Sequence, residues 1–267
     1  MQEYLEIQLD KEAPSLTAER YGDLVSNYTS LYLSMLLFVV DCRSKLQLSD
    51  RTCATTVATA LRVFSRKNIE MTTATDFKKV CVGSLLLACA NDEIQYTASC
   101  VQKVIHDSKM LTSKESKAVM WSVFKDIQFE FKPTVFHFLE AACRQCTPPE
   151  VTAPHAAGLF CDLVKKLMLL VHFGPSCMLR LPSQLCFGCA LAARRMLNIQ
   201  CEVTLAPAER FNMNELDVVC KEIIELSSTE VYPTFLVAKN MPVLQKQIQD
   251  KASELRALLE TAPASLA

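Results

Sequence analysis

Cysteine is the residue type whose spacing in this chain comes closest to a known chemical site. The 267-residue sequence contains 13 cysteines, and four of them form C-x-x-C pairs at 143–146 and 186–189. Two such pairs can supply a tetrahedral zinc site and one pair can act as a redox dithiol, so both chemistries stand as alternatives. Free cysteine is also among the most buried residue types, and the second pair lies in an apolar run. We therefore expect core thiols without metal or disulfide, with burial of Cys81, Cys89, Cys186 and Cys189.

Catalytic side chains do not fall into a known constellation. No two histidines are spaced four residues apart in a metalloprotease pattern, and no serine lies in a G-x-S-x-G turn. The 5 glycines stand apart from one another, so no phosphate-cradling or dinucleotide-binding loop is present in the sequence. The sequence therefore predicts a chain that is not an enzyme and that needs no cofactor.

Composition indicates a helical protein without a nucleic-acid partner. Glycine makes up 5 of 267 residues, far below the usual share of about 7%, and sheet proteins need turn glycines. The formal net charge is −1, and no run of lysine and arginine exceeds two residues. Nucleic-acid-binding domains usually carry a basic patch or stripe. We therefore expect neither an all-β fold nor a nucleic-acid partner.

The apolar runs and the cysteines indicate whether the chain has a membrane partner and in which kind of compartment it lies. The longest apolar stretch, around 31–40, is far shorter than the roughly 20 residues that span a bilayer. Residues 1–12 are acidic, unlike a secretory signal peptide, and the cysteines are odd in number and unpatterned. These features favour a reducing compartment and no membrane partner.

Apolar residues recur at helical spacing along most of the chain. Ser49 and Asp50 predict a helix start, and Thr112–Glu115 has the form of a capping box. The expected helices before Pro133 cover about 24–47, 50–66, 74–90 and 97–107 and the segment after the capping box. Those after it cover about 134–146, 155–173, 182–197, 203–209, 213–227 and 242–261.

Two apolar segments echo each other within the chain. Val80–Ala88 matches Leu185–Ala193 at an offset of 105 residues, with Gly83 and Gly188 at equivalent places. A glycine inside a helix costs up to about 1 kcal/mol relative to alanine, so its repetition indicates two close helix crossings. We therefore expect two similar five-helix units, roughly 24–131 and 133–227, each built around one central helix.

Four segments carry a further similarity: Leu46–Ser65, Leu85–Ile94, Leu111–Thr134 with the following Phe138-Leu139, and Leu179–Ala193. The most specific part is the exit from the capped helix, where Phe129 and Phe131 precede Pro133-Thr134. These segments resemble the cyclin family over about 46–227. The resemblance implies an all-α fold of two tandem five-helix cyclin-like folds with flanking helices. Residues 1–131 would hold the N-terminal flanking segment and first cyclin box, and 132–267 the second fold and the C-terminal helix.

The resemblance also implies a function. A cyclin binds and activates a cyclin-dependent kinase and has no active site of its own, so we expect a kinase partner and no small-molecule ligand. The Ala58-Thr59-Ala60 sequence of the second helix is more similar to transcription-type cyclins than to cell-cycle cyclins. This similarity implies a nuclear location, with the cytoplasm as a second compartment. By position in the family's motifs, the expected kinase-binding residues are Ala90, Asn91, Asp92, Glu93, Met120, Phe124, Phe129 and Phe131.

One departure from the family concerns the kinase contact. Cyclins usually carry a lysine at the end of the third helix and a glutamate on the fifth, and the corresponding residues here are Ala90 and Met120. Both charges are replaced together, which fits the high cost of leaving one buried charge unpaired. We expect a more apolar contact, with Met120 and Phe124 partly exposed beside a core row of Val119, Val123 and Ile127.

Two other readings stay open. A TFIIB-like core also has two cyclin folds, but that family is generally basic because it binds promoter DNA, and it carries an N-terminal zinc ribbon that this sequence lacks. A cyclin-fold scaffold that binds neither kinase nor DNA is the other alternative.

Overall fold

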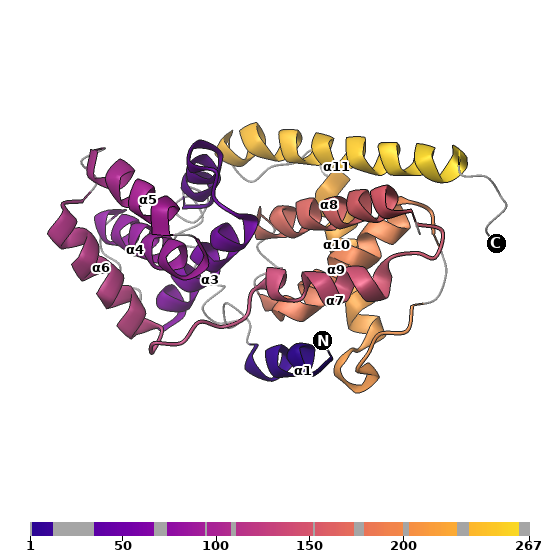
Figure 1. Ribbon diagram of the computed structural model, residues 1–267, viewed down its shortest axis with the longest axis horizontal. Helices are drawn as coiled ribbons and strands as arrows, with labels where there is room; N and C mark the ends of the chain where they lie inside the picture. Colours follow the sequence, from indigo (N-terminus) through magenta and orange to yellow (C-terminus); the bar gives the residue numbers. More distant parts are fainter. Residues whose placement is uncertain are drawn as a thin grey trace. The chain divides into compact units, whose positions relative to one another are not determined.

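The computed structural model describes residues 2–12, 35–66, 74–93, 95–107, 111–151, 153–173, 179–199, 203–228 and 235–261 (Figure 1). Every regular element in these ranges is an α-helix or a 3-10 helix, which confirms the predicted all-α class. The chain divides into two compact units. The first unit is Ala13–Thr134, and the second unit is Met1–Glu12 together with Val135–Ala267. Each unit is described by itself.

The first unit is built around α4 (Ala74–Asp92), which packs against α3 (Asp50–Arg66), α5 (Gln95–Asp107) and α6 (Ser113–Asp126). Residues 35–46 form a further helix. Every residue from Val80 to Cys89 is buried, which explains why this stretch is apolar all round. α4 is therefore the central helix of the unit, as its sequence predicts.

The second unit is built around α9 (Pro182–Met196). This helix packs against α7 (Leu139–Cys146), α8 (Pro154–Leu170) and α10 (Met213–Ser228), and its residues 185–190 are all buried. The long α11 (Phe235–Thr261) lies along α8 (Figure 1). The remaining elements are α1 (Gln2–Lys11) and the 3-10 turns η1 (Val135–His137), η2 (Val171–Phe173) and η4 (Ala208–Arg210).

Both units contain the close helix crossing that the repeated glycine predicts. A Cβ atom added to Gly83 on α4 would lie 2.7 Å from Cγ1 of Val119 and 2.9 Å from Cγ2 of Val123 on α6. A Cβ atom added to Gly188 on α9 would lie 2.6 Å from Cγ1 of Val219 on α10. In each unit, therefore, the central helix meets a second helix at a glycine and a β-branched residue. This second helix is α6, capped by Thr112, in the first unit and α10, capped by the Asn212 side chain, in the second.

The first helix of the chain belongs to the second unit, which differs from the sequence-based grouping of residues 1–131. The carboxylate of Glu12 accepts hydrogen bonds from the Ser183 backbone N–H at 2.9 Å and from the Ser183 hydroxyl at 2.7 Å, and Arg210 pairs with Asp10. Ser183 lies in the first turn of α9, whose cap residue Leu181 has no oxygen on its side chain. A distant carboxylate thus satisfies a backbone N–H group in the first turn of α9 that the local sequence leaves open.

Helix boundaries differ from the sequence expectation at three places. The expected helix over 203–209 is only the 3-10 turn η4, because Pro207 stands immediately before it and lacks a backbone donor. The last helix begins at Phe235, seven residues earlier than expected, and runs through Pro242. The expected helix at 24–47 is described only from residue 35, and its earlier part lies outside the described residues.

Candidate partner-binding site

The cysteines lie where the sequence predicts. Cys81, Cys89, Cys186 and Cys189 are 4%, 1%, 0% and 0% exposed, which confirms their burial. Burial raises the pKa of the Cys89 thiol to about 12, so this thiol is neutral at physiological pH. The cysteines in the described ranges are free thiols, and those ranges hold no cluster of three or more metal-ligating side chains.

Helix α6 carries two of the eight expected contact residues, Met120 and Phe124, and its start is fixed locally. The Thr112 hydroxyl accepts from the Glu115 backbone N–H at 3.2 Å, and the Glu115 carboxylate accepts from the Thr112 backbone N–H at 2.8 Å. This is the capping box that the sequence predicts. Along the helix Val123 and the following Ile127 are buried. The predicted core row is therefore correct for these two residues, whereas Val119 is partly exposed.

An aromatic cluster covers the C-terminal half of α6. The ring of Phe124 lies 5.0 Å from that of Phe129 in an edge-to-face arrangement, 6.2 Å from Phe131 and 5.9 Å from Trp121. Trp121 is 54% exposed and Phe129 is 57% exposed, while Phe124 and Phe131 are partly exposed. We call these four residues the aromatic face. An exposed patch of neighbouring apolar side chains is more often an interaction site than a surface without function.

Trp121 belongs to this face although the sequence analysis did not include it. It precedes Phe124 by three residues on the same helix, and residues three apart on a helix are neighbours. That spacing is the signal from which it could have been predicted. Tryptophan also contributes disproportionately to binding energy at protein interfaces.

The turn after α6 holds Phe129 in an unusual backbone conformation. Gln128 and Phe129 have φ angles of 59° and 57°, in the left-handed region that costs non-glycine residues about 1 kcal/mol or more. The Phe129 N–H donates to the Phe124 carbonyl at 2.9 Å. From α3, Arg62 donates to the Glu130 carbonyl at 2.8 Å. The fold therefore maintains a strained turn that keeps the Phe129 ring on Phe124 and in solvent.

Two of the expected contact residues at the end of α4 form contacts within the chain. Ala90 and Asn91 are exposed, but the Asp92 side chain is only 1% exposed and one of its oxygens lies 3.3 Å from Nε of Arg51. Glu93 accepts hydrogen bonds from the Ser49 backbone N–H at 2.7 Å and from the Thr52 hydroxyl at 2.5 Å. Both carboxylates therefore find partners at the start of α3.

These hydrogen bonds change the ionisation of Glu93. Partial burial by itself raises the pKa of this carboxyl, but the hydrogen bonds from Thr52 and Ser49 together hold the pKa below its ordinary value. Glu93 is therefore a carboxylate at neutral pH, attached to the first turn of α3, where a negative charge is favourable. The chain thus supplies donors to Glu93 and to one oxygen of Asp92, whereas the second Asp92 oxygen is buried without a hydrogen bond from the described residues.

Met120 precedes Phe124 by four residues on α6, so it neighbours the aromatic face on one side. It is partly exposed and lines a groove between α5 and α6, together with Leu86 of α4. The eight expected contact residues thus fall into three places on the first unit: the end of α4, the α5–α6 groove and the aromatic face.

The comparisons with known proteins add no family assignment. No protein-family model and no curated protein matches the chain. In the described ranges, none of the helices has both the length and the apolar character that crossing a membrane requires. The aromatic face is the feature of the described surface with the clearest capacity to bind a protein partner.

Proposed function

We propose that the chain is a cyclin-like regulatory subunit that binds and activates a cyclin-dependent kinase, in the control of transcription or RNA processing in the nucleus. The aromatic face carries this proposal. Phe124, Phe129 and Phe131, which the resemblance assigns to kinase contact, are in ring contact on the surface of the first unit. Each of the two units also has its own central helix that another helix crosses at a glycine. This common feature supports a tandem repeat of one fold.

The contact in this proposal is mainly apolar. Ala90 and Met120 replace the charged pair of the family, and the aromatic rings provide area that is lost to water when a partner docks. A few buried aromatic residues usually supply most of the affinity of an interface. We therefore expect Phe129 and Trp121 to contribute more than Asn91, which has no comparable apolar surface.

Activation would follow from selective binding. A regulatory subunit changes kinase activity only through a higher affinity for the active conformation than for the inactive one. In protein kinases the active conformation pairs a lysine with a glutamate of the regulatory helix and positions the magnesium-binding aspartate. The aromatic face would hold that helix in the active position.

Affinity capture tests the partner class. The purified chain, immobilised and exposed to nuclear extract of its source organism, should retain a cyclin-dependent kinase detected by mass spectrometry. A Phe129→Ala variant should retain at most about one tenth of the kinase that the wild type retains, because an exposed ring of the contact is lost. Tyr4→Ala is the matched control, since Tyr4 is 50% exposed on α1 of the second unit.

The alternatives give different results in the same experiment. Promoter DNA or RNA polymerase in the eluate, without a kinase, would favour the TFIIB-like function. Equal retention of a kinase by the wild type and Phe129→Ala would contradict a contact through the aromatic face.

A further inference from the structure

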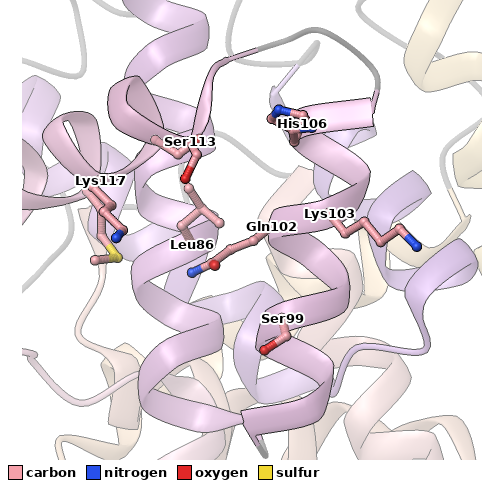
Figure 2. A pocket seen from close by; sticks show the side chains of 9 residues that line it. Leu86, Ser99, Gln102, Lys103, His106, Ser113 and Lys117 are labelled. Atoms are coloured by element: carbon pink, nitrogen blue, oxygen red, sulfur yellow. The ribbon is translucent and has the colours of Figure 1, made fainter.

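A groove with polar and apolar lining residues lies between α5 and α6 in the first unit. Its volume is about 250 Å³, and α4 forms its floor with Leu86 (Figure 2). Figure 2 shows Ser99 and Gln102 of α5 facing Ser113 and Lys117 of α6 across this space. The complete lining is Leu86, Ser99, Gln102, Lys103, His106, Ser113, Ser116, Lys117 and Met120.

The charge of the groove differs from that of the whole chain. The formal net charge of the protein is −1, yet the groove is lined by two lysines and a histidine and by no carboxylate. In the part of the chain that the structure describes, neither Lys103 nor Lys117 forms an ion pair, whereas His106 lies 3.6 Å from Asp107. The groove therefore offers positive charge that the surrounding described residues do not neutralise.

Hydrogen-bond donors surround the same space. The hydroxyls of Ser113 and Ser116 come from α6, and the Gln102 amide extends from α5 into the space between the helices in Figure 2. Ser113 is the first residue of the 14-residue α6, where the helix dipole adds partial positive charge. Lys103 points away from this space in Figure 2, so Lys117 is the lysine that faces it.

We propose that this groove binds a phosphate monoester. A lysine ammonium binds phosphate as a point charge. Hydroxyl donors of Ser113 and Ser116 on α6 and the amide of Gln102 on α5 suit an anion with several terminal oxygens. The volume of about 250 Å³ is sufficient for one phosphate with a short stem.

The stem of the ligand would lie on Leu86 and Met120, which form the apolar part of the lining. A phosphorylated serine or threonine side chain of a protein and a small free phosphate compound share this chemistry. The site adds a ligand to a chain whose sequence predicts none. It is independent of the proposed kinase partner, because phosphate binding is measured on the chain alone.

Titration calorimetry on the full chain tests the site with three probes. They are inorganic phosphate, O-phosphoserine and an end-blocked five-residue peptide with phosphoserine at its centre and alanine elsewhere. Lys117→Gln should weaken binding of the strongest probe about tenfold or more, because a charge-assisted hydrogen bond is lost. Lys114→Gln is the matched control: it removes the same charge from an exposed residue of the same helix that does not line the groove. Its effect should stay below about twofold, and circular dichroism should show equal helix content in both variants.

The probes also separate the two sources of the phosphate. Tighter binding of the phosphopeptide than of inorganic phosphate assigns the site to a phosphorylated protein segment, and equal or weaker binding assigns it to small phosphates. Failure of all three probes to bind at millimolar concentration would overturn the site. Equal losses in Lys114→Gln and Lys117→Gln would overturn it too, because general surface charge would then explain the binding.

Discussion

Two glycines show how much a single side chain decides in this fold. At Gly83 and Gly188 the neighbouring helix approaches so closely that a methyl group would lie within 2.7 Å and 2.6 Å of a valine methyl carbon. Valine is stiff at χ1, so it cannot rotate away without strain. Both glycines are therefore needed for the helix packing of their units.

Alanine substitutions at the glycines should separate this packing role from helix propensity. Gly83→Ala and Gly188→Ala should each lower the free energy of unfolding by roughly 1–2 kcal/mol, because an overpacking cost of about 1–3 kcal/mol exceeds the propensity gain of up to ~1 kcal/mol. Gly158→Ala is the matched control, since a Cβ atom at Gly158 on α8 has no neighbour within 4 Å. It should raise the stability by up to about 1 kcal/mol.

Urea denaturation followed by circular dichroism measures all three variants. A destabilising Gly158→Ala together with a neutral Gly83→Ala would contradict the close crossing.

Glu93 gives the stability a pH dependence of known sign. Its pKa is lower in the folded chain than in the unfolded one, so its carboxylate stabilises the fold above the unfolded pKa of about 4.3. That contribution is lost as the pH falls through the lower folded value. Glu93→Gln should therefore cost about 1 kcal/mol at pH 7, as the loss of a helix cap does, and less below pH 4.

Thermal unfolding across this pH range checks the Glu93 prediction. Glu225→Gln on α10 is the control, because Glu225 is exposed. A Glu93→Gln deficit that is constant from pH 3 to pH 7 would show that the Glu93 charge has no part in the stabilisation.

At the scale of elements, the turn after α6 holds the exposed Phe129 ring in place at the cost of two strained backbone conformations. Gln128 and Phe129 are both left-handed, and glycine adopts that conformation without penalty. Gln128→Gly and Phe129→Gly should therefore each leave stability unchanged or raise it by up to about 1 kcal/mol. Only Phe129→Gly should reduce kinase binding, because Gln128 carries no ring of the aromatic face.

Stability and kinase retention, measured on both variants, test that separation. If Gln128→Gly also abolished retention, the backbone of the turn, and not the ring, would be the important feature.

Local patterns made several elements predictable. The α3 helix begins and ends at the expected residues 50 and 66, and the Thr112 capping box lies in its expected place, because both signals are contained within a few residues. The close approach at Gly83 was predictable because a helix glycine needs a packing reason. The buried cysteines followed from their apolar surroundings.

Contacts between distant residues were not predictable in the same way. Glu93 reaches the start of α3 across 41–44 residues, and Glu12 reaches α9 across 171 residues. Nothing in the local sequence marks either glutamate as a helix cap, because the partner is defined only by the fold. For the same reason, Asp92 and Glu93 looked like free contact residues although they are bound within the chain.

At the scale of the whole molecule, one construction occurs twice. Each unit surrounds an apolar central helix that meets a capped helix at a glycine, and each uses a distant glutamate at the start of a helix. The aromatic cluster around Phe124, by contrast, has no counterpart among the ring contacts described in the second unit, where Phe187 and Phe211 form a single pair. Duplicated architecture with one specialised surface suits a protein that positions a partner.

Reconstitution of kinase activity tests the proposed function most directly. The kinase retained by the chain is purified and its phosphate transfer from ATP to a peptide is measured against increasing concentrations of wild type, Phe129→Ala and Tyr4→Ala. Wild type and Tyr4→Ala should stimulate the kinase equally, and Phe129→Ala should need about tenfold more protein or higher for half-maximal stimulation. No stimulation by the wild type, or equal stimulation by Phe129→Ala, would contradict activation through the aromatic face.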